Sequence, residues 1–162
     1  MAILKYFFGF TILMHLGTSL SGQDLIDVDQ HPAYTDAISE SKNEGKLVLI
    51  LFNGNKCSKP KQTKKLIESS NEVRKYINEN YVFIILYTDD NTELDLKEQF
   101  QSDFIGIKVD TEGKRNIHLE MSKFGKNYTP YFVIIDSSEQ IMKDAGFMET
   151  EAEILEFLSI AY

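Results

Sequence analysis

Two continuous apolar segments, separated by a helical pattern, constrain the fold of this chain more than any other feature. The first is LVLILF at 47–52, and the second opens the segment YVFIILYTDD at 81–90. Neither alternates polar with apolar residues, so we expect strands that are covered on both faces. Between them, residues 57–79 have apolar side chains at helical spacing, with a break near Ser69-Ser70-Asn71. Strand, helix and strand of these lengths predict a βαβ unit with parallel strands and a right-handed crossover.

The elements around this unit complete an α/β pattern. HPAYTDAISESKNEG at 31–45 predicts a short helix, which Gly45 ends. YFVIID at 131–136 and QIMKDAG at 140–146, joined by a polar turn, predict an antiparallel strand pair. An amphipathic helix closes the chain after an acidic first turn, and its apolar residues are Ile154, Leu155, Phe157 and Leu158.

Residues 104–119 are interpreted as a hairpin insertion. Ile105, Ile107 and Val109 alternate with other residues, and Glu112-Gly113 supplies the turn. A short helix around 119–125 is expected to follow. Helix, βαβ, short helix and ββα is the order of elements in an α/β thioredoxin-like fold. We therefore expect a central mixed β-sheet flanked by helices on both faces, with a hairpin insertion.

The first 22 residues have the layout of a secretory signal peptide. MAILK is short and weakly basic, YFFGFTILMHLGTSL is apolar, and small residues follow. The apolar run is short for a membrane span. We expect cleavage near Ser21 or Gly22, a mature thioredoxin-like domain at 23–162 and a periplasmic or secreted location, with membrane contact only before cleavage. An uncleaved N-terminal anchor is the alternative.

The composition narrows the class of partner. The chain has 17 Lys and Arg against 25 Asp and Glu, a net charge of −8, which argues against binding nucleic acid because little would neutralise the phosphates. His31 and His118 lack a Cys or His companion at zinc-ligand spacing, and the sequence has no glycine-rich phosphate loop. No metal and no cofactor are therefore predicted. Asp89 and Asp90 are expected to stabilise a turn through their side chains rather than to act in catalysis.

The only cysteine, Cys57, lies at the predicted start of a helix, within NGNKCSKPKQ at 53–62. In an oxidising compartment, an odd cysteine implies an intermolecular partner or a free reactive thiol. A packed, inert thiol is a further alternative. The helix N-terminus and the neighbouring Lys56, Lys59 and Lys61 favour the thiolate, which is the attacking species. The same lysines are also compatible with a plain solvated surface.

Three stretches together resemble one known family: LVLILFNGNKC, NEVRKYINENYVFIILYTDDNTEL and KFGKNYTPYFVIID. They are similar to the C-terminal thioredoxin-like domain of DsbD-type thiol:disulfide interchange proteins, over about 45–162. The resemblance implies a C-x-x-C motif at the helix start, which is reduced here to C-x-x-P because Pro60 replaces the second cysteine. It also implies a buried aspartate where this chain has Leu51, and a cis-proline facing the cysteines at Thr129-Pro130.

These residues predict thiol–disulfide exchange with protein or peptide thiols and disulfides, with Cys57 as a monothiol nucleophile. The resemblance implies that Thr129 and Pro130 bind the substrate, and Lys56 and Lys59 are candidate contacts by their charge. A second thiol of the same protein normally resolves the mixed disulfide, so net dithiol reductase activity is not expected. The alternative is a non-catalytic peptide-binding module that has lost redox activity. A third interpretation is a homodimer linked through Cys57.

Overall fold

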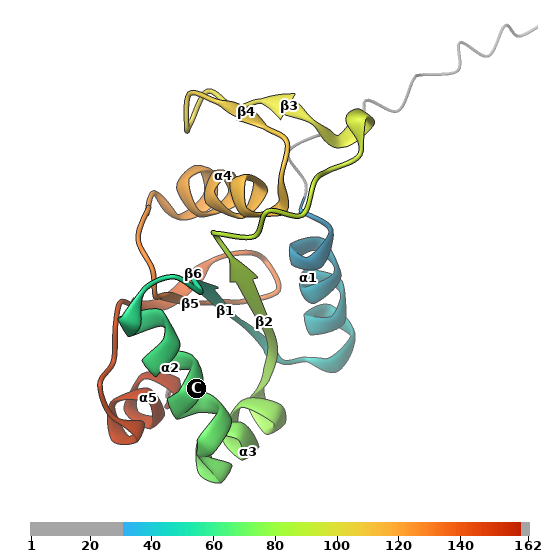
Figure 1. Ribbon diagram of the computed structural model, residues 1–162. Helices are drawn as coiled ribbons and strands as arrows, with labels where there is room; N and C mark the ends of the chain where they lie inside the picture. The colour runs from blue at the N-terminus through green and yellow to red at the C-terminus, as the bar shows by residue number, and fades with distance from the viewer. Residues whose placement is uncertain (1–30, 160–162) are drawn as a thin grey trace, which may run out of the picture.

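The computed structural model describes residues 31–159, in which a four-stranded sheet has the order β2-β1-β5-β6 (Figure 1). The signal peptide predicted from the sequence lies outside these residues. Along the chain, the elements are α1 Pro32–Glu44, β1 Leu47–Asn53, α2 Ser58–Ser69, α3 Asn71–Asn80, β2 Tyr81–Tyr87, a 3-10 turn Leu96–Glu98, β3 Phe100–Gln101, β4 Lys108–Val109, α4 Glu112–Phe124, β5 Tyr131–Ile135, β6 Ile141–Ala145 and α5 Glu151–Leu158. The expected α/β thioredoxin-like architecture is confirmed.

The predicted βαβ unit is present. Strand β1 pairs in parallel with β2 from Leu47↔Tyr81 to Asn53↔Tyr87, and it pairs antiparallel with β5 on its other side. Every residue of β1 is buried. The expectation that the second strand is equally covered is wrong in part. Strand β2 is at the edge of the sheet, and its middle residues 83–85 are only half-buried.

Helices cover both faces of the sheet, and β1 supplies side chains to both layers. Val48, Ile50 and Phe52 pack with residues of α1 and α4. Leu49 and Leu51 pack with residues of α2, α3 and α5 on the opposite face. Successive side chains of a strand point to opposite faces, so a strand covered twice must be apolar throughout. Figure 1 shows the two groups of helices on either side of the sheet.

The break predicted near residue 70 is confirmed, since α2 ends at Ser69 and α3 begins at Asn71. The Ser70 hydroxyl accepts a hydrogen bond from the Val73 N–H at 3.0 Å, which caps α3. Gly45 ends α1 in the left-handed conformation, with φ of 68°, as its position in the sequence predicts.

The hairpin predicted at 104–119 is wrong in its position. The two short strands that pair are β3 and β4, and α4 starts at Glu112 where the turn was expected. Thr111 caps this helix by accepting a hydrogen bond from the Lys114 N–H at 3.3 Å. Gly113 lies in the first helical turn, and a Cβ there would stand 2.6 Å from the Asp90 carbonyl oxygen. The glycine therefore serves a close approach of two backbones rather than a turn, and the short helix expected at 119–125 is the end of α4.

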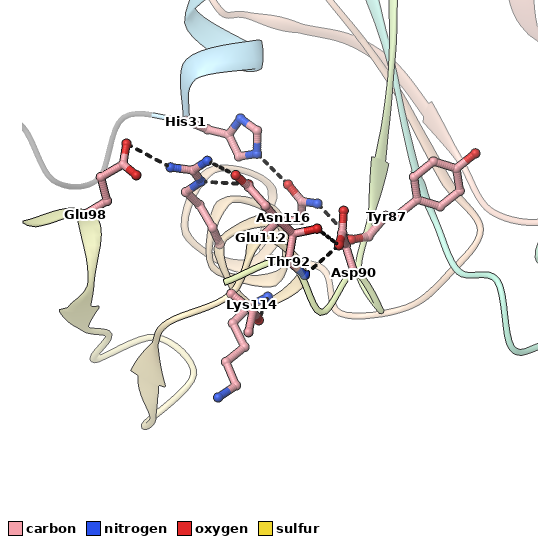
Figure 2. Close-up of polar contacts among 10 residues, drawn as sticks. His31, Tyr87, Asp90, Thr92, Glu98, Glu112, Lys114 and Asn116 are labelled. Atoms are coloured by element: carbon pink, nitrogen blue, oxygen red, sulfur yellow. Dashed lines mark hydrogen bonds and ion pairs between the residues drawn. The ribbon is translucent and has the colours of Figure 1, made fainter. Parts of the chain in front are cut away.

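A buried polar bridge joins the starts of α1 and α4 to the end of β2 (Figure 2). The Tyr87 carbonyl oxygen can only accept a hydrogen bond, so the side-chain nitrogen of Asn116, Nδ2, must donate to it, at 2.8 Å. The other end of the Asn116 amide, the acceptor Oδ1, then lies 2.5 Å from His31 Nε2. His31 must therefore carry its proton on Nε2. Burial lowers the pKa of His31 below its ordinary value of 6.5, which agrees with a neutral ring.

No helix within residues 31–159 combines the length and the apolar character needed to cross a bilayer.

Candidate functional site

Cys57 lies on the surface at the N-terminus of α2, as the sequence predicts. Its backbone is extended, with φ of −98° and ψ of 156°, and its carbonyl accepts from the Lys61 N–H at 3.4 Å. The thiol is free and exposed. The alternative of a packed thiol is therefore wrong, because this cysteine precedes the helix instead of facing the core.

The loop that carries Cys57 is held by the end of the neighbouring strand. Asp89 accepts from the backbone N–H of Asn55 at 2.7 Å and of Lys56 at 3.1 Å, both through Oδ2. Its Oδ1 accepts from the Asn55 side chain at 3.3 Å. The parallel register of β1 and β2 brings Asp89 beside this loop, because both strands end at the same edge of the sheet. Asp90 accepts from the N–H and the hydroxyl of Thr92, so the predicted turn role is confirmed for Asp90, whereas Asp89 holds the neighbouring loop instead of its own turn.

Thr129 and Pro130 lie next to the same loop. The peptide bond between them is cis, as the resemblance implies. The Thr129 hydroxyl stands 3.4 Å from the position that a Cβ on Gly54 would occupy, so the absence of a side chain at Gly54 leaves room for Thr129. Pro130 is buried and Thr129 is half-buried. Two segments more than 70 residues apart in the sequence thus meet at one end of the sheet.

Pro60 and Leu51, at the positions where the resemblance implies a second thiol and a carboxylate, are apolar and buried. Pro60 is the third residue of α2, where a backbone N–H has no acceptor within the helix. Its carbonyl accepts from the Asn53 side chain at 3.4 Å. Leu51 is fully buried among core residues of the α2, α3 and α5 layer. Neither position offers a group that can take up a proton or attack a disulfide.

Lys56 and Lys59, the candidate substrate contacts, are both exposed. The Lys59 ammonium lies 5.2 Å from the centre of the Phe147 ring, within the range of a cation–π interaction. Phe147 follows β6 and was not identified from the sequence. It brings a half-exposed aromatic ring to the start of α2.

A buried carboxyl group contacts the segment that leads to Thr129, and no sequence pattern indicated it. Glu120, on α4, is 1% exposed, and its Oε1 accepts from the Tyr128 N–H at 3.0 Å. Its Oε2 has no hydrogen-bond partner. Because burial removes the carboxyl group from water, the pKa of Glu120 is raised to about 7.

Residues 31–159 contain no group of three or more His, Cys, Asp and Glu side chains arranged to hold a metal ion.

The family model described as a thioredoxin-like domain matches residues 34–159, which span both Cys57 and Thr129-Pro130. The chain belongs to this family. The match covers almost all of the described fold, including the sheet, both helical layers and the candidate site. The matched description names a thioredoxin-like domain and does not specify the DsbD type.

Solved structures with the same fold include an oxidoreductase described as DsbH, with a TM-score of 0.59 and 16% identity over 78% of this chain and 80% of that one. A thioredoxin from Thermus thermophilus gives a TM-score of 0.54 and 16% identity, over 77% and 80% of the two chains. A thioredoxin-fold protein from Helicobacter pylori gives 0.50 and 22%, over 70% and 68%. At these identities the likeness concerns the fold alone. The search of curated proteins returns no match.

Proposed function

We propose that this chain is an exported thioredoxin-like protein that exchanges thiols with disulfides through Cys57 acting alone. The observation that carries the proposal is the exposed thiol at the start of α2, which follows a loop whose Gly54 lies close to the Thr129 hydroxyl. The proposal includes the finer resemblance to DsbD-type domains, a signal peptide at 1–22, a mature domain at 23–162 and a periplasmic or secreted location.

In the proposed reaction, the Cys57 thiolate attacks one sulfur of a partner disulfide. The partner's S–S bond breaks, a bond from Cys57 to the attacked sulfur forms, and the other sulfur leaves as a thiolate. No net oxidation or reduction occurs in this step. Because Pro60 stands where a resolving cysteine would be, an external thiol must attack the mixed disulfide to release Cys57. The chain alone would not act as a dithiol reductase.

Thr129 and Pro130 are proposed to form the wall on which a partner peptide lies. An extended peptide would pair with the backbone near Thr129 and so bring its sulfur to Cys57.

A non-catalytic binding module is the second candidate function. The observations that favour it are the buried apolar side chains of Leu51 and Pro60. Such a module would keep the peptide wall at Thr129 and Pro130 and would not depend on the Cys57 thiol.

The deciding experiment incubates the purified protein with a model peptide disulfide and follows the mixed disulfide by mass spectrometry. We expect Cys57 to form the adduct faster in the folded protein than in urea, and added thiol to release it. Cys57→Ser is the matched control and should form none. Alkylation of Cys57 across the pH range provides a second readout of thiolate reactivity. Adduct formation no faster than in the unfolded chain, with peptide binding unchanged in Cys57→Ser, would favour the binding module.

A further inference from the structure

An unusually basic surface surrounds Cys57 in a chain that is otherwise strongly acidic. Residues 54–66 contain five of the 17 basic residues and none of the 25 acidic ones. The lysine surface is defined here as these five residues: Lys56, Lys59, Lys61, Lys64 and Lys65. All except the half-buried Lys64 are exposed. The excess of negative charge therefore belongs entirely to the rest of the molecule.

The lysine surface has little compensation from carboxylates. Within residues 31–159, Lys64 is its only member in an ion pair, with Glu68 at 3.7 Å. Asp89 contacts the loop beside Cys57, but its hydrogen bonds there go to the backbone of Asn55 and Lys56 and to the Asn55 amide, not to a lysine ammonium. Positive charges without carboxylate partners near an exposed thiol attract anions and repel cations at a distance.

Two of these lysines lie over aromatic rings on neighbouring elements. The Lys59 ammonium is 5.2 Å from the Phe147 ring centre, and the Lys64 ammonium is 5.5 Å from that of Tyr87. Cation–π contacts of this kind restrict where a long side chain points. The charge of Lys59 is thus held toward the segment after β6, and the charge of Lys64 toward the end of β2.

We propose that the lysine surface selects acidic partners, namely polypeptide segments with Asp or Glu beside the cysteine that reacts with Cys57. This inference rests on the proposed thiol exchange and deepens it, because it names the chemistry of the partner. Charge complementarity of this type acts mainly on the rate of encounter and on the choice of partner. The surface would raise the local concentration of acidic segments and exclude basic ones.

The test compares the rates at which Cys57 reacts with three small disulfides of different charge. These are the dianionic 5,5′-dithiobis(2-nitrobenzoate), the neutral 2,2′-dithiodipyridine and the dicationic cystamine. The measured quantity is the rate with the anionic reagent divided by the rate with the neutral one. At about 10 mM salt, where the screening length is roughly 30 Å, we expect this ratio to be about tenfold higher in the folded protein than in the unfolded chain. At about 1 M salt, where this length falls to roughly 3 Å, the preference should disappear.

The variant Lys59→Gln/Lys61→Gln removes two charges from the lysine surface and should lower the anionic preference at least severalfold. Its matched control, Lys97→Gln/Lys108→Gln, removes two exposed charges from the segment around β3 and β4 and should leave the preference unchanged.

A second experiment compares the same two variants in their reaction with two cysteine peptides of equal length, each activated as a disulfide. In one peptide Asp and Glu flank the cysteine, and in the other Lys and Arg flank it. The acidic peptide should form its mixed disulfide faster, and only the first variant should abolish this advantage.

Rates that, relative to the unfolded chain, are equal for all three reagents and independent of salt would overturn the inference while leaving thiol exchange in place. A preference that the control variant reduces as much as the test variant would also overturn it, because the effect would then follow net charge. Failure of Cys57 to react with any disulfide in the folded protein would overturn the inference and the proposed function together.

Discussion

The Asp89 side chain holds the loop before Cys57, although Asp89 is not part of the C-x-x-P motif. Its carboxylate accepts two backbone N–H groups from the loop that ends at Cys57, at 2.7 and 3.1 Å. Hydrogen bonds to a charged acceptor contribute about 1.5–3 kcal/mol each. A loop held in this way presents Cys57 in a fixed position relative to Thr129.

Replacing Asp89 by alanine should release this loop. The amides of Asn55 and Lys56 would lose their acceptor, so their hydrogen exchange should accelerate by about tenfold or more, since each 1.4 kcal/mol corresponds to a factor of ten. Exchange measured by NMR provides the readout. Asp95→Ala, an exposed position whose side chain caps nothing, should leave both amides unchanged. Unaltered protection in Asp89→Ala would show that the loop is held by other contacts.

Glu120 should make folding stability depend on pH. Because the folded protein binds this proton more tightly, with a pKa of about 7 against an ordinary 4.5, the stabilisation is complete below about pH 4.5 and is lost as the pH rises through 7. The lowered pKa of His31 acts in the opposite direction, since its contribution is lost as the pH falls below 6.5.

Glu120→Gln removes the first of these effects and leaves the second. Its free energy of unfolding relative to the parent should rise by up to about 3 kcal/mol between pH 4.5 and pH 8. Urea unfolding at several pH values measures this difference. Glu156→Gln, at an exposed position, should track the parent throughout. A difference that stays constant with pH would mean that the carboxyl group titrates normally.

Sequence reasoning identified site residues that stand in recognisable motifs, and it missed the roles of residues whose hydrogen-bond partners lie elsewhere in the sequence. Cys57 is the only cysteine and lies at a predicted helix start, and the family resemblance indicated Pro130, so both were identified before the fold was known. The partners of Asp89 and Glu120 are 33 or 34 and eight residues away, respectively, and only the folded chain brings them together. In the sequence, nothing distinguishes Glu120 from the other acidic residues. Only the fold buries its carboxyl group and brings the Tyr128 N–H to it.

Helix α4 is the element whose sequence signal was most misleading. Alternating apolar residues before position 110 and the Glu112-Gly113 pair are typical of a hairpin, whereas Thr111 in fact caps a helix. Gly113 is required because the backbone of Thr88 and Asp90, distant in sequence, leaves no room for a side chain at this position. By contrast, β1 depends on a continuous local apolar run and the α2–α3 break on a local cap, so both were predicted correctly.

Gly113→Ala should therefore weaken the junction between α4 and the end of β2. The added Cβ would lie 2.6–2.8 Å from backbone atoms of Asp90 and Thr88, which cannot move aside as a flexible side chain could. We expect a loss of about 1–3 kcal/mol in the free energy of unfolding, measured with urea, although alanine normally favours helices. Gly146→Ala, whose Cβ would meet only Tyr128 at 3.4 Å, is the tolerated control. Equal effects of the two changes would contradict the predicted clash.

The distribution of charge over the whole molecule bears on the homodimer interpretation. Cys57 is the only cysteine, so any disulfide that it forms must be intermolecular. Two copies joined at Cys57 would bring two lysine surfaces together. Like charges at this distance repel, and salt screens the repulsion. A disulfide between two copies should therefore be disfavoured at low ionic strength.

Oxidation of the purified protein in air should give a covalent dimer more slowly at about 10 mM salt than at about 0.5 M salt, because the screening length shortens severalfold over this range. Non-reducing gels measure the rate, and Lys59→Gln/Lys61→Gln should dimerise faster at low salt. Rapid dimerisation at low ionic strength would instead indicate that the two copies attract each other by contacts outside the lysine surface.

The pairing of β1 with strands from later in the chain has a consequence for the order of folding. Its parallel neighbour ends at Tyr87, whereas its antiparallel neighbour reaches Ile135, which pairs with Val48. During synthesis the ribosome must therefore extend the chain to Ile135 before the central strand can be paired on both sides along its length. Contacts between such distant residues slow folding, because long loops must close first. We therefore expect the nascent chain to stay incompletely folded until Ile135 has been synthesised, which is compatible with the export proposed above.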